Sequence, residues 1–127
     1  MSITPVFSRL EAHPKKWGDE LWITNNEKYC GKILRFNEGS SFSMHYHVLK
    51  EETWCVTKGR LKLEYYDLEK ADKLDKILEE GDVVHLNPCV PHKLTALVES
   101  SVFEVSTQHF NDDSYRIEKG ASQKGNF

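Results

Sequence analysis

Cysteine is scarce in this sequence, and the few cysteines present form no recognisable pattern. The 127 residues include only Cys30, Cys55 and Cys89, which lie far apart and contain no Cys-x-x-Cys pair. An odd number of separated cysteines predicts neither a disulfide framework nor a structural zinc ribbon. We expect Cys30 and Cys55 to be small buried hydrophobic residues.

Long apolar runs and an excess of positive charge are also missing. No stretch approaches the roughly 18 residues that span a bilayer, and no basic start followed by an apolar segment marks the N-terminus. We therefore expect a cytoplasmic protein without a membrane partner. The formal net charge of -3 at pH 7 gives no reason to expect nucleic acid as a partner.

The length and composition indicate one globular domain. With 39% hydrophobic and 29% charged residues, the chain is long enough to bury one core and too short for two. We divide it into an N-terminal arm (1–16), a central domain (17–110) and a polar tail (111–127), whose last residues we expect to be mobile. The apolar side chains of the arm are Ile3, Val6, Phe7 and Leu10.

The central domain is predicted to consist of short β-strands. Runs rich in β-branched and aromatic residues alternate with turns of Asn, Asp, Gly and Pro, at a spacing close to that of a β-sandwich or barrel. Nearly every residue from Asp67 to Lys76 is charged, so we expect a solvated hairpin loop or one exposed helical turn there. The predicted strands are 20–24, 29–36, 41–47, 53–58, 61–68, 83–86, 93–97 and 102–107.

A short stretch in the middle of the chain contains a possible metal-binding pattern. His45 and His47 are two residues apart, so on a strand both imidazoles project from the same face. Glu52 follows after a four-residue turn. Two imidazoles and a carboxylate are a suitable partial shell for a divalent transition metal, and His92 is the candidate for a further ligand. His109 has no such support, but it could reach the mouth of a barrel.

The spacing of these residues resembles that of the cupin family. The segment 81–92 resembles the second family motif. The resemblance implies an all-β fold, a cupin double-stranded β-helix or jelly-roll barrel, with one divalent transition metal (zinc, manganese, nickel or iron) held by His45, His47, Glu52 and His92. The residues that match the first motif are Gly39, His45, His47, Glu52 and Gly59.

The second motif departs from the family pattern at two positions. Cys89 stands where the family has glycine, and Ala96 stands where it has asparagine. A non-glycine residue in that turn costs about 1 kcal/mol if its φ is positive. Cys89 also places a soft sulfur near the site, where we favour a packing role over direct ligation.

Short flanking words extend the resemblance to the cupin domain of type II phosphomannose isomerases and to D-lyxose-type sugar isomerases. The resemblance to the lyxose group implies the same four metal ligands in this chain, and the position of Lys50 resembles that of the group's proposed catalytic lysine. The extra strands or partner domain that help to build the pockets of those enzymes are not found in this chain. The matching words are Lys-Lys-Trp17-Gly18, the strand 29–34, the strand 103–107 and Asp112-Asp113-Ser-Tyr-Arg116.

These features lead to a hypothesis of metal-dependent sugar or sugar-phosphate isomerisation or epimerisation, with Lys50 and Glu104 as acid and base. Glu104 shares a strand face with Val102 and Ser106 that would point into a barrel, where a carboxylate needs a partner such as Lys50 or a substrate hydroxyl. The alternatives are a cupin that binds a carbohydrate or small acid without turnover, and a metal-dependent dioxygenase. We also expect a homodimer in which the arm covers an edge of the partner's sheet.

Overall fold

The computed structural model describes residues 3–118. This part of the chain contains no helix, and therefore none long and apolar enough to cross a bilayer. Its strands are β1 (Glu11–Lys15), β2 (Gly18–Asn25), β3 (Cys30–Phe36), β4 (Met44–Tyr46), β5 (Glu52–Lys58), β6 (Arg60–Asp67), β7 (Asp72–Glu79), β8 (Val83–Leu86), β9 (His92–Ala96), β10 (Ser100–Ser106) and β11 (Tyr115–Glu118).

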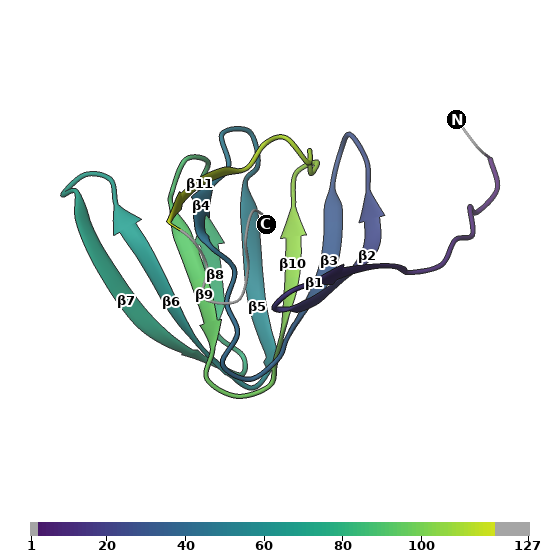
Figure 1. Cartoon of the computed structure of the whole chain (residues 1–127). Coiled ribbons are helices and arrows are strands. Elements are labelled where there is room, and N and C mark those ends of the chain that lie inside the picture. Colours follow the sequence, from purple (N-terminus) through teal and green to yellow (C-terminus); the bar gives the residue numbers. More distant parts are fainter. Residues whose placement is uncertain (1–2, 119–127) are drawn as a thin grey trace.

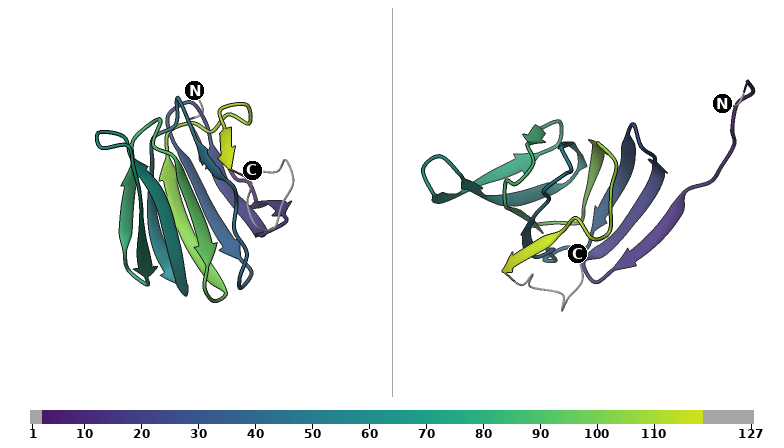
Figure 2. Two further views of the ribbon diagram at one scale, coloured as in Figure 1. Left: turned by 60° about the vertical axis from the view of Figure 1, so that its left-hand side comes forward. Right: turned by 90° about the horizontal axis from the view of Figure 1, so that it is seen from above.

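The strands form two antiparallel sheets that curve around a common interior (Figures 1 and 2). One sheet has the order β1-β2-β3-β10-β5-β8, and the other has the order β11-β4-β9-β6-β7. Spatial neighbours are often distant in sequence, as β10 lies between β3 and β5. The prediction of an all-β jelly roll is confirmed.

The hydrophobic core lies between the two sheets. Leu34, Val102 and Val56 stand opposite one another on β3, β10 and β5, and all three are buried. Burying each such side chain stabilises the fold by roughly 1.5–3 kcal/mol. The other buried members of the core are Trp17, Phe36, Phe42, Trp54, Leu61, Leu63, Leu78, Leu86, Leu94 and Ala96.

The turn between β5 and β6 requires glycine. Gly59 has a φ of 87°, and a Cβ there would collide with the hydroxyl of Ser100 and the carbonyl of Glu99. Glycine reaches this conformation without steric cost, which lets β6 return tightly into the opposite sheet. The glycine at this position thus has a packing reason in this chain.

The charged segment after β6 differs from its prediction. Residues 72–76 belong to β7, which pairs with β6 from Asp72 opposite Asp67 to Glu79 opposite Arg60, so the loop between the two strands is short. On β7 only Leu78 is buried, because the strand lies at a sheet edge and exposes nearly all its side chains to water. The charged composition of this segment is therefore that of an exposed edge strand.

Both ends of the chain contribute a strand that the sequence pattern did not predict. Residues 11–15 lie within the expected arm, yet they form β1 and pair with β2, leaving residues 3–10 extended away from the body of the molecule (Figure 1). Residues 115–118 lie within the expected tail and form β11, which pairs with β4. The prediction of a mobile end of the tail falls on residues 119–127, outside the described residues.

Candidate metal centre

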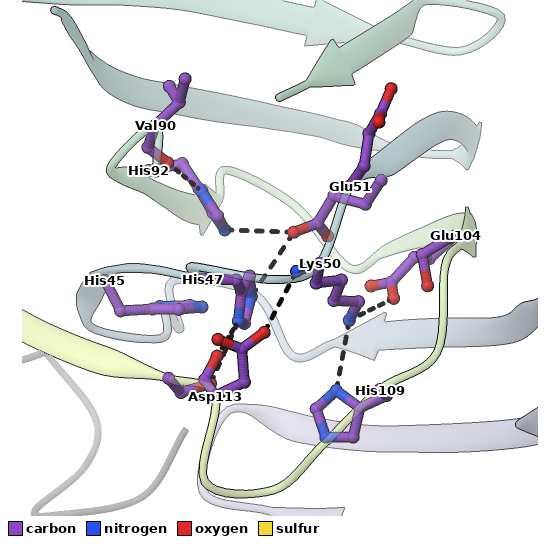
Figure 3. A network of polar contacts seen from close by, with 12 residues as sticks. His45, His47, Lys50, Glu51, Val90, His92, Glu104, His109 and Asp113 are labelled. Carbon is purple, nitrogen blue, oxygen red and sulfur yellow. Dashed lines mark hydrogen bonds and ion pairs between the residues drawn. The ribbon is translucent and has the colours of Figure 1, made fainter. Parts of the chain in front are cut away.

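Three histidine side chains converge in the interior (Figure 3). His45 lies on β4, His47 follows this strand, and His92 begins β9, where it stands directly opposite His45. One ring nitrogen from each of the three lies within 4.8 Å of the other two, and all three residues are buried. The strand pairing of β4 with β9 therefore brings the distant His92 to the pair that the sequence placed on one face.

Backbone carbonyl groups set the tautomer of each imidazole. A carbonyl oxygen only accepts hydrogen bonds, so a ring nitrogen that bonds to one must carry the proton. In each ring this nitrogen is Nδ1, which leaves the lone pair on Nε2, the form that binds a metal. The Nδ1 atoms donate to Ser43 O from His45 (2.7 Å), to Asp113 O from His47 (2.6 Å) and to Val90 O from His92 (2.9 Å).

The surroundings keep all three imidazoles neutral. Burial, followed by repulsion from the neighbouring His47, lowers the pKa of His92 to about 3. Burial also lowers the pKa of His45, with added repulsion from the other two imidazoles, and that of His47, with added repulsion from Lys50. Neutral imidazoles are the form that coordinates a cation.

Glu52, the first residue of β5, presents one carboxylate oxygen to the histidines. Its Oε2 lies 3.4 Å from Nε2 of His47 and 3.8 Å from Nε2 of His92, while its Oε1 accepts a hydrogen bond from the Trp54 indole at 2.7 Å. Burial and the negative charge of Glu104 raise the pKa of this carboxyl group. Three imidazole nitrogens and a carboxylate oxygen are donors that suit zinc, manganese, iron or nickel.

A buried ion pair borders the histidine cluster. Nζ of Lys50 lies 2.6 Å from Oε2 of Glu104, so the carboxylate predicted to face the interior does so and has Lys50 as its partner (Figure 3). Burial alone would lower the pKa of Lys50, but the attraction of Glu104 and Glu52 outweighs it and raises this pKa. Burial alone would raise the pKa of Glu104, but Lys50 and then Lys32 lower it. Both groups are therefore ionised.

Asp113 is a structural support of the site that the sequence pattern did not indicate. Its backbone oxygen accepts the hydrogen bond from Nδ1 of His47 at 2.6 Å. Its side-chain oxygens accept hydrogen bonds from the backbone N–H groups of Val48, Leu49 and Lys50 at 2.9–3.2 Å. One buried residue from the C-terminal segment thus fixes both a histidine of the cluster and the turn that carries Lys50.

A second buried lysine lies near the site and was not predicted as part of it. Lys32 is 1% exposed, stands opposite Glu104 across β3 and β10, and lies 3.3 Å from Oε1 of Glu20. Its ammonium also lies 4.3 Å from the centre of the Trp22 ring, whose indole N–H donates to Glu20 at 2.9 Å. Strand periodicity contained the signal, because Lys32 falls between the inward-facing Cys30 and Leu34.

His109 reaches the site from the loop after β10, as its position in the sequence suggested. Its Nδ1 lies 3.3 Å from Nζ of Lys50 and its Nε2 lies 3.2 Å from Oδ1 of Asn111. An ammonium group only donates, so Nδ1 of His109 accepts and Nε2 carries the proton. Burial, followed by the positive charges of Lys50 and Lys32, lowers the pKa of His109 to about 3.

The turn of the second motif is strained at Cys89. This residue has a φ of 74°, in the left-handed region, and its N–H donates to the carbonyl of His47 at 2.6 Å. The side chain is exposed and belongs neither to the histidine cluster nor to the residues around it. Of the other cysteines, Cys30 is buried as predicted and Cys55 is only partly buried.

The six predicted site residues line one cavity of about 40 Å³. This inner cavity brings together residues from β4, the turn after it, β5, β9 and β10. Its floor is aromatic, because Phe42 packs against His45 with ring centres 4.9 Å apart and Trp54 packs against His92 at 5.3 Å. The six residues are His45, His47, Lys50, Glu52, His92 and Glu104.

Comparisons with known proteins agree with the fold. A family model described as a cupin domain matches residues 32–105. No curated protein matches the chain. Oxalate decarboxylase of Bacillus subtilis, in a study of its Mn(II) centres, superposes with a TM-score of 0.75 at 17% identity, over 85% of this chain and 30% of that one. The capsular polysaccharide assembling protein CapF of Staphylococcus aureus superposes with a TM-score of 0.76 at 13% identity, over 88% and 32%.

The likeness to these two structures concerns the fold. The chain spans about a third of the length of each of these proteins.

Proposed function

Because the chain belongs to the cupin family, we propose that it is a metal-dependent isomerase or epimerase of a small hydroxy-carbonyl compound, such as a sugar or sugar phosphate. The observation that carries this proposal is the buried pair of Lys50 and Glu104, which lines the same cavity as the histidine cluster and Glu52. A proton donor and a proton acceptor beside a metal are what a shift of a carbon-bound proton requires.

The histidines and Glu52 would hold the metal. His45, His47 and His92 offer Nε2 lone pairs, and Glu52 offers Oε2 beside two of them. A bound divalent metal would supply Lewis-acid polarisation of a carbonyl and its adjacent hydroxyl. Since the cluster is buried and its walls are partly apolar, few water molecules would compete for that position.

Lys50 and Glu104 would handle the proton. Lys50 is a cation that can donate to an oxygen on which negative charge develops, and Glu104 is a carboxylate that can accept a proton from carbon. A ligand oxygen that draws the ammonium of Lys50 away would weaken the attraction that lowers the pKa of Glu104. Burial would then raise that pKa, so Glu104 would become a stronger base when the ligand is bound.

The experiment is solvent exchange. Metal-analysed protein is incubated in deuterated water with a panel of pentoses, hexoses and their phosphates, and deuterium at the carbon next to the carbonyl is followed by NMR. We expect incorporation with a subset of the panel and none with metal-stripped protein. Binding without incorporation would instead identify a cupin that holds a small ligand without turnover.

Substitutions then separate proton transfer from structural support. Lys50→Met and Glu104→Gln should each abolish exchange while the metal content stays unchanged. A Glu104 that only orients a metal ligand would instead loosen the metal by about 10–100-fold. If both variants keep normal exchange and normal metal, the assignment of the two residues is wrong.

We also propose that the protein works as a homodimer. Val6 and Phe7 of the extended arm are 81% and 89% exposed, and residues 3–10 lie away from the body of their own chain (Figure 1). Exposed apolar side chains on an extended segment are favourable only if something covers them. A second copy offers sheet edges of the kind that proteins usually cover.

A further inference from the structure

A second cavity adjoins the inner one. This outer cavity has a volume of about 290 Å³ and shares Glu20, His109 and Ser114 with the inner cavity. Its remaining lining residues are His13, Lys15, Trp22 and Asn111. The two cavities therefore adjoin at these shared residues, on the side of the inner cavity where Lys50 contacts His109.

The outer cavity exists because β1 prolongs the inward face of the six-stranded sheet. His13 stands opposite Glu20 in the register of β1 and β2, so both side chains project from the same face. The His13 ring stacks on Trp22 with ring centres 4.0 Å apart, and Trp22 in turn contacts His109 at 5.4 Å. The loop that follows β10 closes the other side with His109, Asn111 and Ser114.

His109, which lines both cavities, is held in place by hydrogen bonds to its backbone and to its ring. The amide side chain of Asn25 accepts a hydrogen bond from the backbone N–H of His109 at 2.8 Å and donates to its carbonyl at 3.0 Å. The His109 ring bridges Lys50 and Asn111. His109 therefore touches a residue of the inner cavity with one nitrogen and a residue of the outer cavity with the other.

The inner cavity is too small for a whole sugar. A water molecule needs about 10–15 Å³ of such space, so about 40 Å³ accommodates on the order of three groups of that size. The hydroxy-carbonyl end of a ligand fits this limit, and the rest of the molecule does not. The adjoining outer cavity is several times larger and lies next to Lys50, where the remaining atoms would emerge.

The chemistry of the outer cavity favours neutral hydroxyl groups. Asn111 and Ser114 each donate and accept hydrogen bonds, as hydroxyls do. Among residues 3–118, Lys15 is the only lysine or arginine that lines this cavity, and the carboxylate of Glu20 is part of the same lining. A phosphate carries up to two negative charges and is usually bound by several cations or backbone N–H groups, and the described residues of this lining supply one lysine.

We propose that the outer cavity is a subsite for the uncharged polyhydroxyl tail of a ligand whose hydroxy-carbonyl end enters the inner cavity. This inference rests on the proposed function, because the proposed function places the hydroxy-carbonyl end of the ligand in the inner cavity. It adds that affinity grows with the length of the tail, and that Asn111 and Lys15 take part in recognising the tail without touching the reacting atoms.

Calorimetric titration of the metal-loaded protein tests the subsite independently of turnover. The probes are dihydroxyacetone, erythrulose and xylulose, which share a hydroxy-carbonyl end and carry tails of increasing length. We expect affinity to rise along the series. Asn111→Leu removes an exposed amide from the outer cavity. It should lower the affinity for xylulose by about tenfold and leave the affinity for dihydroxyacetone unchanged. Asn87→Leu is the matched control, because this exposed asparagine lines a different cavity. It should change neither the affinity for xylulose nor that for dihydroxyacetone.

The outcomes separate the two proposals. Length-dependent binding that Asn111→Leu removes, without any deuterium exchange, supports the subsite and overturns the isomerase. If deuterium exchange occurs but the affinities depend neither on tail length nor on Asn111, the subsite is overturned and the isomerase is not. Dihydroxyacetone phosphate that binds tenfold more tightly than dihydroxyacetone, with the gain lost in Lys15→Met, overturns the uncharged tail in favour of an anionic one. No binding of any probe overturns the subsite.

Discussion

The ammonium nitrogen of Lys50 lies 2.6 Å from Oε2 of Glu104, and both side chains are at most 5% exposed. Neither charge can be solvated by bulk water, so each depends on the other. Lys50→Met should therefore lower the free energy of unfolding by about 3–5 kcal/mol. The double variant with Glu104→Leu should recover most of this loss in urea denaturation. A single variant as stable as the unchanged protein would contradict the pairing.

Metal binding should depend on the histidine cluster. The unchanged protein, dialysed and examined by elemental analysis, should contain close to one transition metal per chain. His47→Ala combined with His92→Ala removes two of the three Nε2 donors and should abolish this content. His85→Ala is the control, because that histidine is exposed and bonds to Thr53 and Glu51 outside the cluster. Undiminished metal in the double variant would rule out the site.

The acid stability of the protein should depend in part on His109. Its pKa is about 3 in the folded state, against 6.5 for an ordinary histidine, so below pH 6.5 the unfolded chain binds a proton that the folded chain does not. The stability from this difference is present above pH 6.5 and is lost as the pH falls toward 3. In His109→Gln the free energy of unfolding should fall less steeply, by up to about 1.4 kcal/mol per pH unit. Superimposable profiles of the two proteins would disprove this contribution.

The positive φ of Cys89 predicts a stabilising substitution. Cys89→Gly removes the steric cost of the left-handed conformation, and the free energy of unfolding should rise by about 1 kcal/mol. Cys89→Ala keeps that cost and should give no gain, which separates backbone strain from loss of the thiol. Since the side chain is exposed, both variants should keep their metal content. Equal stability of the two variants would argue against strain at this turn.

The arm should control the oligomeric state. Light scattering at micromolar concentration should give the mass of a dimer for the intact chain and that of a monomer after deletion of residues 3–10. The milder variant with Val6→Ser and Phe7→Ser should weaken the dimer in the same direction, because these side chains are exposed in the single chain. A monomeric mass for the intact protein would exclude the dimer.

Much of the fold follows from local pattern. Strands such as β3, β5 and β10 were predicted within a few residues, since apolar alternation over a buried face is a strong signal. The strand β7 was not, because only Leu78 on it is buried and an edge strand exposed to water keeps little apolar alternation. The strand β11 was not predicted either, and it pairs with β4, which is distant from it in the sequence.

The candidate site, too, could be predicted from the sequence only in part. The spacing of His45, His47 and Glu52 shows a shared face and a following turn, so these side chains could be grouped without a structure. The spacing of Lys32 from Leu34 indicates an inward-facing side chain, but spacing brings neither Lys32 nor Asp113 to the site. Lys32 reaches the site because β3 lies beside β10, and Asp113 reaches it because its segment folds back over the turn after β4.

By itself the sequence determined which side chains share a strand face, because that depends only on whether their positions differ by an even number. It also determined the donors available to a metal. Only the tertiary structure decided that Asp113, 66 residues from His47, sets the tautomer of that histidine, and that Lys50 pairs with Glu104. These contacts join residues on separate strands and loops, so they depend on sheet order and loop path, which no local pattern specifies.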